Sequence, residues 1–155
     1  MTLTLEAAAA ALKADGLAVE LTNPTTLVVS VGLDDKARER SLGVVVLPAV
    51  SGAPPFVKLV SVLPTSVTED QVPDLLAAIN EVNIAAALGA FVLEAGRQLE
   101  FRYLLAVPET GVDSLLTWLA PFIGWEALHF GDYLEGVLDG AISLLVLPQL
   151  LLEAT

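Results

Sequence analysis

The chain has 155 residues, which fits one domain with its own hydrophobic core, and it lacks cysteine, so disulfides, thiolate metal sites and cysteine nucleophiles are excluded. Its 19 acidic and 7 basic residues give a formal net charge of −12, which disfavours binding to nucleic acids and to anionic membrane surfaces. Hydrophobic residues make up 55% and charged residues only 17% of the chain, which is an apolar composition for a monomer of this size.

The first half of the chain predicts a helix and then strands. Residues 4–16 are rich in alanine, the best helix former, and Thr4 and Gly16 suit the two ends of a helix. Alternating and β-branched apolar runs predict four strands, at residues 17–21, 26–33, 42–50 and 56–64. The third of these runs is continuously apolar, which predicts burial on both of its faces.

A charged segment, DDKARERS at residues 34–41, separates the second and third predicted strands. Charged connections between strands usually lie in solvent, so the pattern is typical of a solvated loop. A loop that binds a partner is the alternative interpretation.

A long helix follows the fourth strand. Thr68 and Gln71 have the spacing of a capping box, and the residues after them carry an apolar stripe at helical spacing. Residues 89–108 then alternate between apolar and polar side chains around a turn at Gly96, which predicts a β-hairpin.

From Gly111 the apolar residues return to helical spacing, with Thr110 or Asp113 able to support the start of the helix. Pro121 is expected to kink this helix or split it in two, because proline lacks the N–H that the helix needs. Residues 134–140 predict a final helical turn that stops at Gly140.

The order of elements predicts an α+β fold in a single domain, residues 1–155. Short links between the strands favour a mostly antiparallel sheet, and helices before, between and after the strands pack against it.

The apolar run at residues 140–154 is shorter than the ~20 residues that a spanning helix needs, and Pro148 interrupts it, so no membrane span is expected. The first residues lack a basic start and include Glu6, which is unlike a signal peptide, and the absence of cysteine agrees with a cytoplasmic protein. The apolar composition is then best explained by a surface that another molecule covers, of which a homodimer is the simplest form.

Two asparagines stand in the apolar run INEVNIAAALGAFVL, at residues 79–93. Helical spacing places Asn83 inside the apolar stripe and Asn80 at its edge. A buried amide costs on the order of 1–3 kcal/mol unless it is hydrogen-bonded, so we expect Asn83 to bond backbone groups of the neighbouring hairpin or a nearby loop. A ligand-binding role for the two asparagines is the alternative.

Residues 75–108, LLAAINEVNIAAALGAFVLEAGRQLEFRYLLAVP, resemble the central signature of the YbjN-like family of bacterial proteins. The matching features are Asn80 and Asn83, then residues 89–93, then residues 99–103. The resemblance implies a fold like that of type III secretion chaperones, and extends to uncharacterised cyanobacterial and plastid proteins. It implies a chaperone-like or regulatory role and supplies no catalytic residues.

Most catalytic templates are missing from the sequence, including the P-loop, the dinucleotide-binding glycine motif and the nucleophile elbow. The single histidine, His129, lies one helical turn from Glu126 on one side and from Asp132 and Tyr133 on the other. This set makes an incomplete zinc site, so we predict no metal, no cofactor and no enzymatic activity.

Aromatic residues are concentrated in the same helical region, at Trp118, Phe122, Trp125, Phe130 and Tyr133. Packing in the core or in a dimer interface is the expected role of such a cluster. A pocket for a small molecule near residues 118–133 is the alternative.

Three functional hypotheses follow from these patterns. The first is a non-catalytic, protein-binding module, chaperone-like or regulatory, that acts as a homodimer. The second is a small-ligand sensor or an enzyme with a pocket near His129 and residues 118–133. The third is a structural subunit of a larger assembly, docked through residues 141–152. The sequence favours the first.

Overall fold

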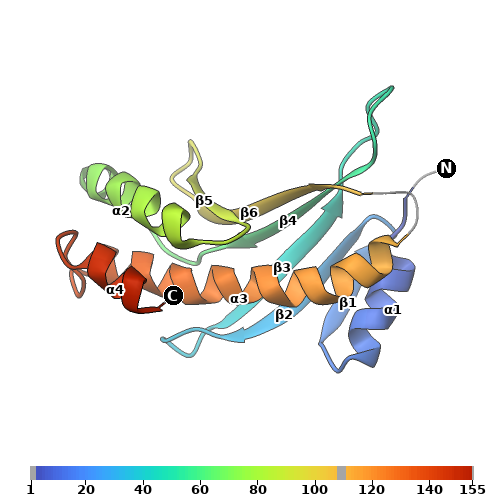
Figure 1. Cartoon of the computed structure of the whole chain (residues 1–155), viewed down its shortest axis with the longest axis horizontal. Coiled ribbons are helices and arrows are strands. Elements are labelled where there is room, and N and C mark those ends of the chain that lie inside the picture. Colours follow the sequence, from blue (N-terminus) through green and yellow to red (C-terminus); the bar gives the residue numbers. More distant parts are fainter. Residues whose placement is uncertain (1–2, 108–110, 155) are drawn as a thin grey trace.

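The computed structural model describes residues 3–107 and 111–154, and it has the predicted α+β architecture, with helices packed against one antiparallel sheet (Figure 1). The helical elements are α1 Glu6–Ala14, the 3₁₀ turn η1 Glu69–Gln71, α2 Val72–Ala85, α3 Val112–Leu138 and α4 Leu147–Ala154. The strands are β1 Val19–Asn23, β2 Thr26–Leu33, β3 Glu39–Val46, β4 Phe56–Val62, β5 Ala90–Leu93 and β6 Leu99–Ala106. Thr110, predicted to support the start of α3, and Pro108, at the end of the predicted hairpin, lie outside the described residues.

The sheet is six-stranded in the order β1-β2-β3-β4-β6-β5, and each neighbouring pair of strands is antiparallel. The first four strands follow one another as a meander; short turns join β1 to β2 and β2 to β3, and a longer loop, residues 47–55, joins β3 to β4. The chain then leaves the sheet to form α2 and returns as the β5–β6 hairpin, which places β6 beside β4 and β5 at the edge.

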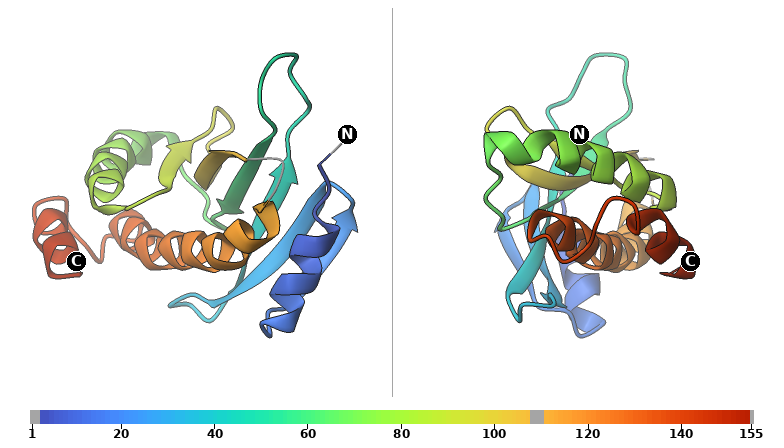
Figure 2. Two further views of the ribbon diagram at one scale, coloured as in Figure 1. Left: turned by 45° about the vertical axis from the view of Figure 1, so that its right-hand side comes forward. Right: turned by 90° about the vertical axis from the view of Figure 1, so that its left-hand side faces the viewer.

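Helix α3 runs across one face of the sheet and forms the centre of the core (Figure 1). Figure 2 shows α1 beside the N-terminal part of α3, and α2 with α4 beside its C-terminal part, as the contacts between these helices also indicate. Alternate residues of the strands face α3 and are fully buried; they include Leu27, Leu42, Leu59 and Phe101.

Close packing of α3 on the sheet depends on a glycine within the helix. A Cβ atom at Gly124 would stand 2.2 Å from Cγ1 of Val31 on β2. Glycine costs about 1 kcal/mol relative to alanine in a helix interior. Here that cost is offset by the close approach of α3 to β2, which buries the apolar residues on both sides.

Of the two outcomes expected at Pro121, a kink or a split, the split does not occur, because α3 continues through Pro121 as one element, and residues 134–140 contain its end (Figure 1). Buried residues recur at helical spacing before and after the proline, for example Leu116 and Ile123. Tertiary packing of this face outweighs the roughly 3 kcal/mol that an interior proline costs. The helix ends as predicted near Gly140, whose φ is 76°.

The third strand also differs from the prediction. Strand β3 begins at Glu39 and ends at Val46, so it takes in part of the charged segment and excludes residues 47–50. Its residues alternate between buried and more accessible positions, which corrects the prediction of burial on both faces. The buried side chains of β3 point toward α3, and the others point away from α3, on the opposite side of the sheet.

The apolar tail is partly core. Leu147 and Leu151 of α4 are buried, while Leu145 keeps 94% of its side chain exposed. Helix α4 packs against α2, and its register puts Leu147 and Leu151 on the same side of the helix. Within the described residues, no helix combines the length and hydropathy needed to cross a membrane.

Candidate functional site

Asn83 has the partner that the sequence predicts. Its side-chain oxygen accepts the backbone N–H of Phe91 at 2.7 Å, and its side-chain nitrogen donates to the carbonyl of Phe91 at 3.1 Å. This pair of bonds joins the C-terminal part of α2 to β5, so Asn83 has a structural role. Asn80 is exposed, as its place at the edge of the stripe indicates, and lies apart from this contact.

Replacing Asn83 with alanine is expected to lower the free energy of unfolding by about 1–3 kcal/mol, because the backbone N–H and C=O of Phe91 lose their partners. Chemical denaturation of the two proteins at one concentration measures the difference. Asn80→Ala is the matched control, and it should stay within about 0.5 kcal/mol of the wild type. Similar losses in both variants would show that the amide of Asn83 is not the stabilising group.

Glu126 lies on the buried face of α3, away from His129, with which the sequence grouped it. Its carboxylate accepts the backbone N–H groups of Ala87, Leu88 and Gly89, at 2.6, 3.2 and 3.2 Å. These residues form the corner between α2 and β5. Glu126 therefore fixes that corner and is not part of an acid–base pair with His129.

The exposed aromatic residues of α3 form a strip on the side of the helix that faces away from the sheet. Trp118 is 56% exposed, Phe122 36% and Trp125 51%, and the Phe122 and Trp125 rings lie 6.1 Å apart. We call these three residues the aromatic strip. Phe130 is buried and faces the core instead, so the predicted aromatic cluster is divided between two faces of the helix.

The aromatic strip lies within a stretch of helix whose exposed surface has no charged side chain. Between Asp113 and Asp132, α3 contains one charged residue, the buried Glu126. Trp118, Phe122, Trp125 and His129 follow one another at alternating intervals of four and three residues, which is the spacing of a helix-pairing seam. The surface is thus suited to pack against another helix.

A second candidate is a small cavity one turn beyond the aromatic strip. It has a volume of about 280 Å³ and is lined by Asp35, His129, Asp132, Tyr133 and Ile142. Three elements supply these residues, namely the β2–β3 turn, α3 and the α3–α4 link. The structure therefore brings His129, Asp132 and Tyr133 together, as their helical spacing predicts, and adds Asp35 and Ile142, which the sequence did not connect with them.

The His129 ring is held by its aromatic neighbours. It stacks on Trp125 with 4.9 Å between ring centroids and an angle of 9°, and it meets the Tyr133 ring edge-on at 5.5 Å. Its Nε2 atom is buried and makes no hydrogen bond within the described residues. The stacking fixes the orientation of the imidazole, and the surrounding side chains shield its Nε2 atom from solvent.

Asp132 is the residue of this cavity whose protonation differs most from an ordinary carboxyl group. Burial raises the pKa of Asp132, and the neighbouring charge of Asp35 raises it further, to about 6. A hydrogen bond from the backbone N–H of Asp35 opposes part of this increase in the pKa of Asp132.

Next to the cavity lies a network of charged residues that the sequence did not reveal. Arg38 Nη2 donates to Glu135 Oε1 at 2.6 Å, and Arg38 Nε donates to Asp34 Oδ2 at 2.8 Å. Thr65 Oγ1 also donates to Glu135, at 2.7 Å, and Lys36 bridges Glu135 at 3.4 Å and Asp139 at 2.8 Å. The network ties the β2–β3 turn to the C-terminal part of α3.

The interpretation of residues 34–41 as a solvated loop therefore holds only for residues 35–37, which are exposed, because residues 39–41 belong to β3. Asp34 and Arg40 are buried, and the Asp34 carboxylate accepts the backbone N–H groups of Lys36 and Arg38, which shapes the turn. One signal for this structure was present in the sequence, since three of only seven basic residues are concentrated in this segment. Their partner Glu135 lies far away in the chain, so local patterns could not identify it.

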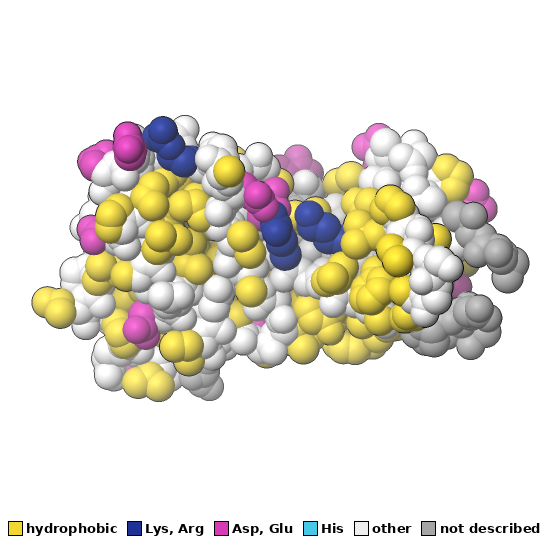
Figure 3. All heavy atoms as spheres, turned by 90° about the horizontal axis from the view of Figure 1, so that it is seen from above, with side chains coloured by type: hydrophobic (Ala, Val, Ile, Leu, Met, Phe, Trp, Pro, Cys, Tyr) yellow, Lys and Arg dark blue, Asp and Glu magenta, His cyan; other side chains and the backbone are white. Residues whose placement is uncertain are grey.

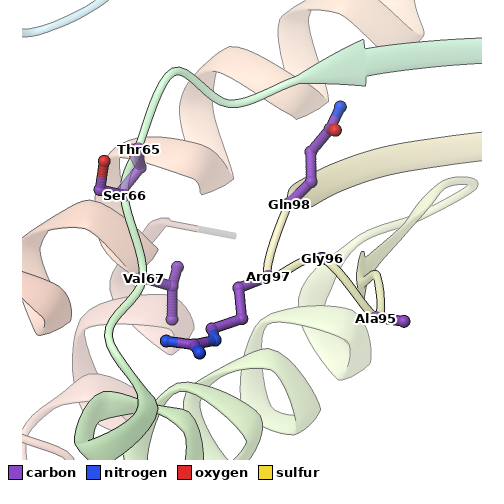
Figure 4. Close-up of a pocket in the computed structure, with 7 residues that line it drawn as sticks. All are labelled: Thr65, Ser66, Val67, Ala95, Gly96, Arg97 and Gln98. Carbon is purple, nitrogen blue, oxygen red and sulfur yellow. The ribbon is translucent and has the colours of Figure 1, made fainter.

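Another cavity, of about 500 Å³, lies between the segment before η1 and the β5–β6 turn. Figure 4 shows that the Arg97 and Val67 side chains point toward each other there, whereas Ser66 and Gln98 point away. Its polar groups do not converge on a common point, which a binding site for a small molecule requires.

No group of three or more His, Asp or Glu side chains in the described part of the chain is placed to hold a metal ion. Neither a comparison with models of known protein families nor a comparison with curated proteins gives a match for this chain. The resemblance of residues 75–108 to the YbjN-like family thus stays a prediction.

Proposed function

We propose that this protein is a non-catalytic, protein-binding module, chaperone-like or regulatory, that acts in the cytoplasm as a homodimer. The observation that carries the proposal is the aromatic strip of α3. Large exposed aromatic side chains on an uncharged helix face are typical of a protein interface, where Trp and Tyr often supply most of the binding energy. The YbjN-like resemblance of residues 75–108 agrees with a chaperone-like role.

A second copy of the chain is the occupant that electrostatics favours for the aromatic strip. The net charge of −12 makes two copies repel each other over most of their surfaces. The uncharged stretch of α3, residues 114–131, is about 25 Å long at 1.5 Å per residue, and two copies can meet there without opposing like charges. A basic partner would not be attracted electrostatically to this stretch. An identical helix would bury its own exposed aromatic side chains against those of the first copy.

The face of the sheet opposite α3 is a second surface with exposed apolar side chains, which lie among the charged Lys58 and Arg102, and we assign it to a partner polypeptide. Leu104 on β6 is 56% exposed, and the cross-strand row Val28, Gly43, Val60 and Arg102 lies on the same side of the sheet. Figure 3 shows the molecule from above, with two broad hydrophobic areas separated by a few charged side chains.

The dimer can be tested by removing the aromatic strip. The double substitution Trp118→Ser and Trp125→Ser is expected to weaken dimerisation at least about 100-fold, because each tryptophan acts twice in a symmetric interface. Sedimentation velocity between 1 and 100 μM, on the order of common dimer dissociation constants, measures this shift.

Leu104→Ser is the matched control, since it removes an exposed apolar side chain from the sheet and should leave the dimer intact. A wild-type protein that is monomeric throughout this range and recovers no partner in a pull-down would contradict the proposal. Self-association that survives the double substitution would place the dimer interface elsewhere.

The cavity beside the aromatic strip favours a second candidate function, the binding of a small ligand. The observation behind it is that polar side chains from two elements, Asp35 of the β2–β3 turn and Asp132 of α3, line one cavity. The third hypothesis, docking through residues 141–152, is less well supported, because Leu147 and Leu151 are already used in the core.

A further inference from the structure

We infer that the partner of the sheet face opposite α3 is an amphipathic helix whose apolar side carries one aspartate or glutamate, and that this carboxylate pairs with Lys58. The inference rests on the proposed assignment of this face to a partner polypeptide, and it names the chemistry of that partner. Lys58 lies in the middle of β4, which β3 and β6 flank in the sheet. A partner that covers the face therefore also covers Lys58.

Apolar side chains surround Lys58 on this face. Val45 of β3 and Leu104 of β6 are its cross-strand neighbours. Phe56 and Val60 precede and follow it by two residues on β4, so their side chains point to the same side of the sheet. We call these five residues the Lys58 patch. Leu104 is exposed, so the patch is open to solvent.

The positive charge of Lys58 has no counter-charge in the part of the chain that the structure describes. Arg102, the other basic residue of this sheet face, pairs with Glu94 and, at 2.8 Å, with Glu100. Within residues 3–107 and 111–154, none of the ion pairs includes Lys58. Acidic residues outnumber basic residues by 19 to 7 in this chain, so a lysine without an acidic partner is a distinctive feature of the surface. Figure 3 shows basic side chains at the border of a broad hydrophobic area.

The charge of Lys58 determines what the partner must carry. A helix that buries the four apolar side chains of the Lys58 patch also removes water from the ammonium group. A buried ammonium group without a counter-charge is strongly unfavourable. The flexible stem of lysine can lie along the apolar surface while its Nζ atom donates hydrogen bonds to a carboxylate. A partner with an acidic residue at this point therefore binds better than one with a neutral or basic residue.

The position of β4 within the sheet determines the form of the partner. The backbone groups of β4 are already bonded to β3 and β6, so a partner strand cannot add beside Lys58 and must contact the patch through side chains. A helix makes this kind of contact on the other face, where α3 runs across the sheet (Figure 1). A second copy of the chain does not suit this patch, because a two-fold contact centred on it would place two unpaired lysines against each other.

The spacing of the Lys58 patch predicts a motif in the partner helix. Phe56 and Val60 lie roughly 7 Å from Lys58 along β4, and the neighbouring strands lie roughly 5 Å away. One turn of an α-helix rises about 5.4 Å, which is close to both spacings. The acidic residue should therefore be flanked by apolar residues one helical turn before it and one helical turn after it.

The test is a selection on the full chain from a phage-displayed library of helical peptides of about 18 residues, which form about five turns. The library has a framework of alanine and glutamine, which are good helix formers, and the residues of one helix face are randomised. Depletion on the Leu104→Ser protein removes peptides that bind outside the Lys58 patch. We expect the remaining peptides to carry Asp or Glu with apolar residues one turn away on each side.

Lys58→Met tests the ion pair directly, because methionine keeps an unbranched apolar side chain and removes the charge. A selected peptide should bind this variant at least about tenfold more weakly in isothermal titration calorimetry. Replacing the acidic residue of the peptide with its amide should cause a similar loss on the wild type and little further loss on Lys58→Met. Lys13→Met is the matched control, since Lys13 is exposed on α1 and lies outside the Lys58 patch, and it should leave the affinity unchanged. Circular dichroism checks that both variants keep the fold.

Two results would overturn the inference and leave the assignment of this face to a partner polypeptide intact. They are selected peptides without an enriched acidic residue, and selected peptides that bind the wild type and Lys58→Met equally. If no peptide remains after depletion on the Leu104→Ser protein, the assignment of the face fails, and the inference fails with it. None of these results depends on the aromatic strip, so the proposed homodimer is tested separately.

Discussion

Replacing Glu135 with alanine is expected to lower the free energy of unfolding by about 2–3 kcal/mol, because Arg38 and Thr65 lose a buried, charged hydrogen-bond acceptor. The Glu135 side chain is only 4% exposed, and it accepts hydrogen bonds from Arg38 and Thr65. Chemical denaturation at a fixed protein concentration, followed by tryptophan fluorescence and circular dichroism, measures the loss.

Asp139→Ala is the matched control for this prediction. Asp139 belongs to the same network, but its pair with Lys36 is half-exposed on both sides, so its loss should cost less than about 1 kcal/mol. If both substitutions lowered the free energy of unfolding equally, the burial of Glu135 would not be the reason that its contacts stabilise the fold.

The same network predicts loss of stability in acid. Burial alone would raise the pKa of Glu135, but the hydrogen bonds from Arg38 and Thr65 outweigh it and hold the pKa below its ordinary value. Burial also opposes ionisation of Asp34, yet hydrogen bonds from Arg38 and Lys36 lower its pKa to about 2. A lowered pKa in the folded state contributes stability above about pH 4, and this contribution is lost as the pH falls toward 2. In the Glu135→Ala protein this acid transition should be smaller.

The second large effect is expected at Glu126. Alanine at this position should lower the free energy of unfolding by about 3 kcal/mol or more, because three backbone N–H groups at the corner after α2 lose a charged acceptor. The side chain is buried, so water cannot easily replace the carboxylate. Denaturation measures the global loss, and amide hydrogen exchange at Ala87, Leu88 and Gly89 locates it.

Glu126→Gln provides the control that separates shape from charge. Glutamine keeps the size of the side chain and one acceptor oxygen, but its NH₂ group faces the backbone N–H donors of residues 87–89. The free energy of unfolding of this variant should therefore lie between those of the wild type and the alanine variant. Unchanged hydrogen exchange at residues 87–89 in the alanine variant would contradict the role assigned to Glu126.

Local patterns were sufficient for much of the fold. The capping box of Thr68 and Gln71 is present, with the Gln71 side-chain oxygen accepting the backbone N–H of Thr68 at 2.9 Å. The bond from Asn83 to the neighbouring hairpin could also be predicted, because an amide within an apolar stripe must find a partner and β5 is the next element in the chain.

Contacts between distant parts of the chain could not be predicted in the same way. The charged segment at residues 34–41 resembles a solvated loop until Glu135 is brought beside Arg38 by the packing of α3 on the sheet. Likewise Pro121 breaks a local rule, and only the burial of α3 on both sides of the proline explains why the helix continues.

The candidate site shows the same division. Helical spacing correctly grouped His129 with Asp132 and Tyr133, since these residues share one face of α3. Spacing also placed Glu126 one turn from His129, but Glu126 faces the core. Asp35 and Ile142 belong to other elements, so their place in the cavity required the fold.

The most direct test of the central claim is the distance between α3 helices in the dimer. The chain has no cysteine, so Ser114→Cys supplies a single site for a nitroxide label beside the aromatic strip. Dipolar electron paramagnetic resonance should give one intermolecular distance between the two labels. Parallel helices should give roughly 10 Å, the distance between the axes of packed helices. Antiparallel helices that cross at the middle of residues 114–131 should give roughly 27 Å, because the rise of 1.5 Å per residue also separates the labels along the axis. This coupling should disappear when Trp118→Ser and Trp125→Ser are added. No coupling at concentrations where the protein self-associates, or coupling that the added substitutions leave unchanged, would contradict a homodimer formed through the aromatic strip.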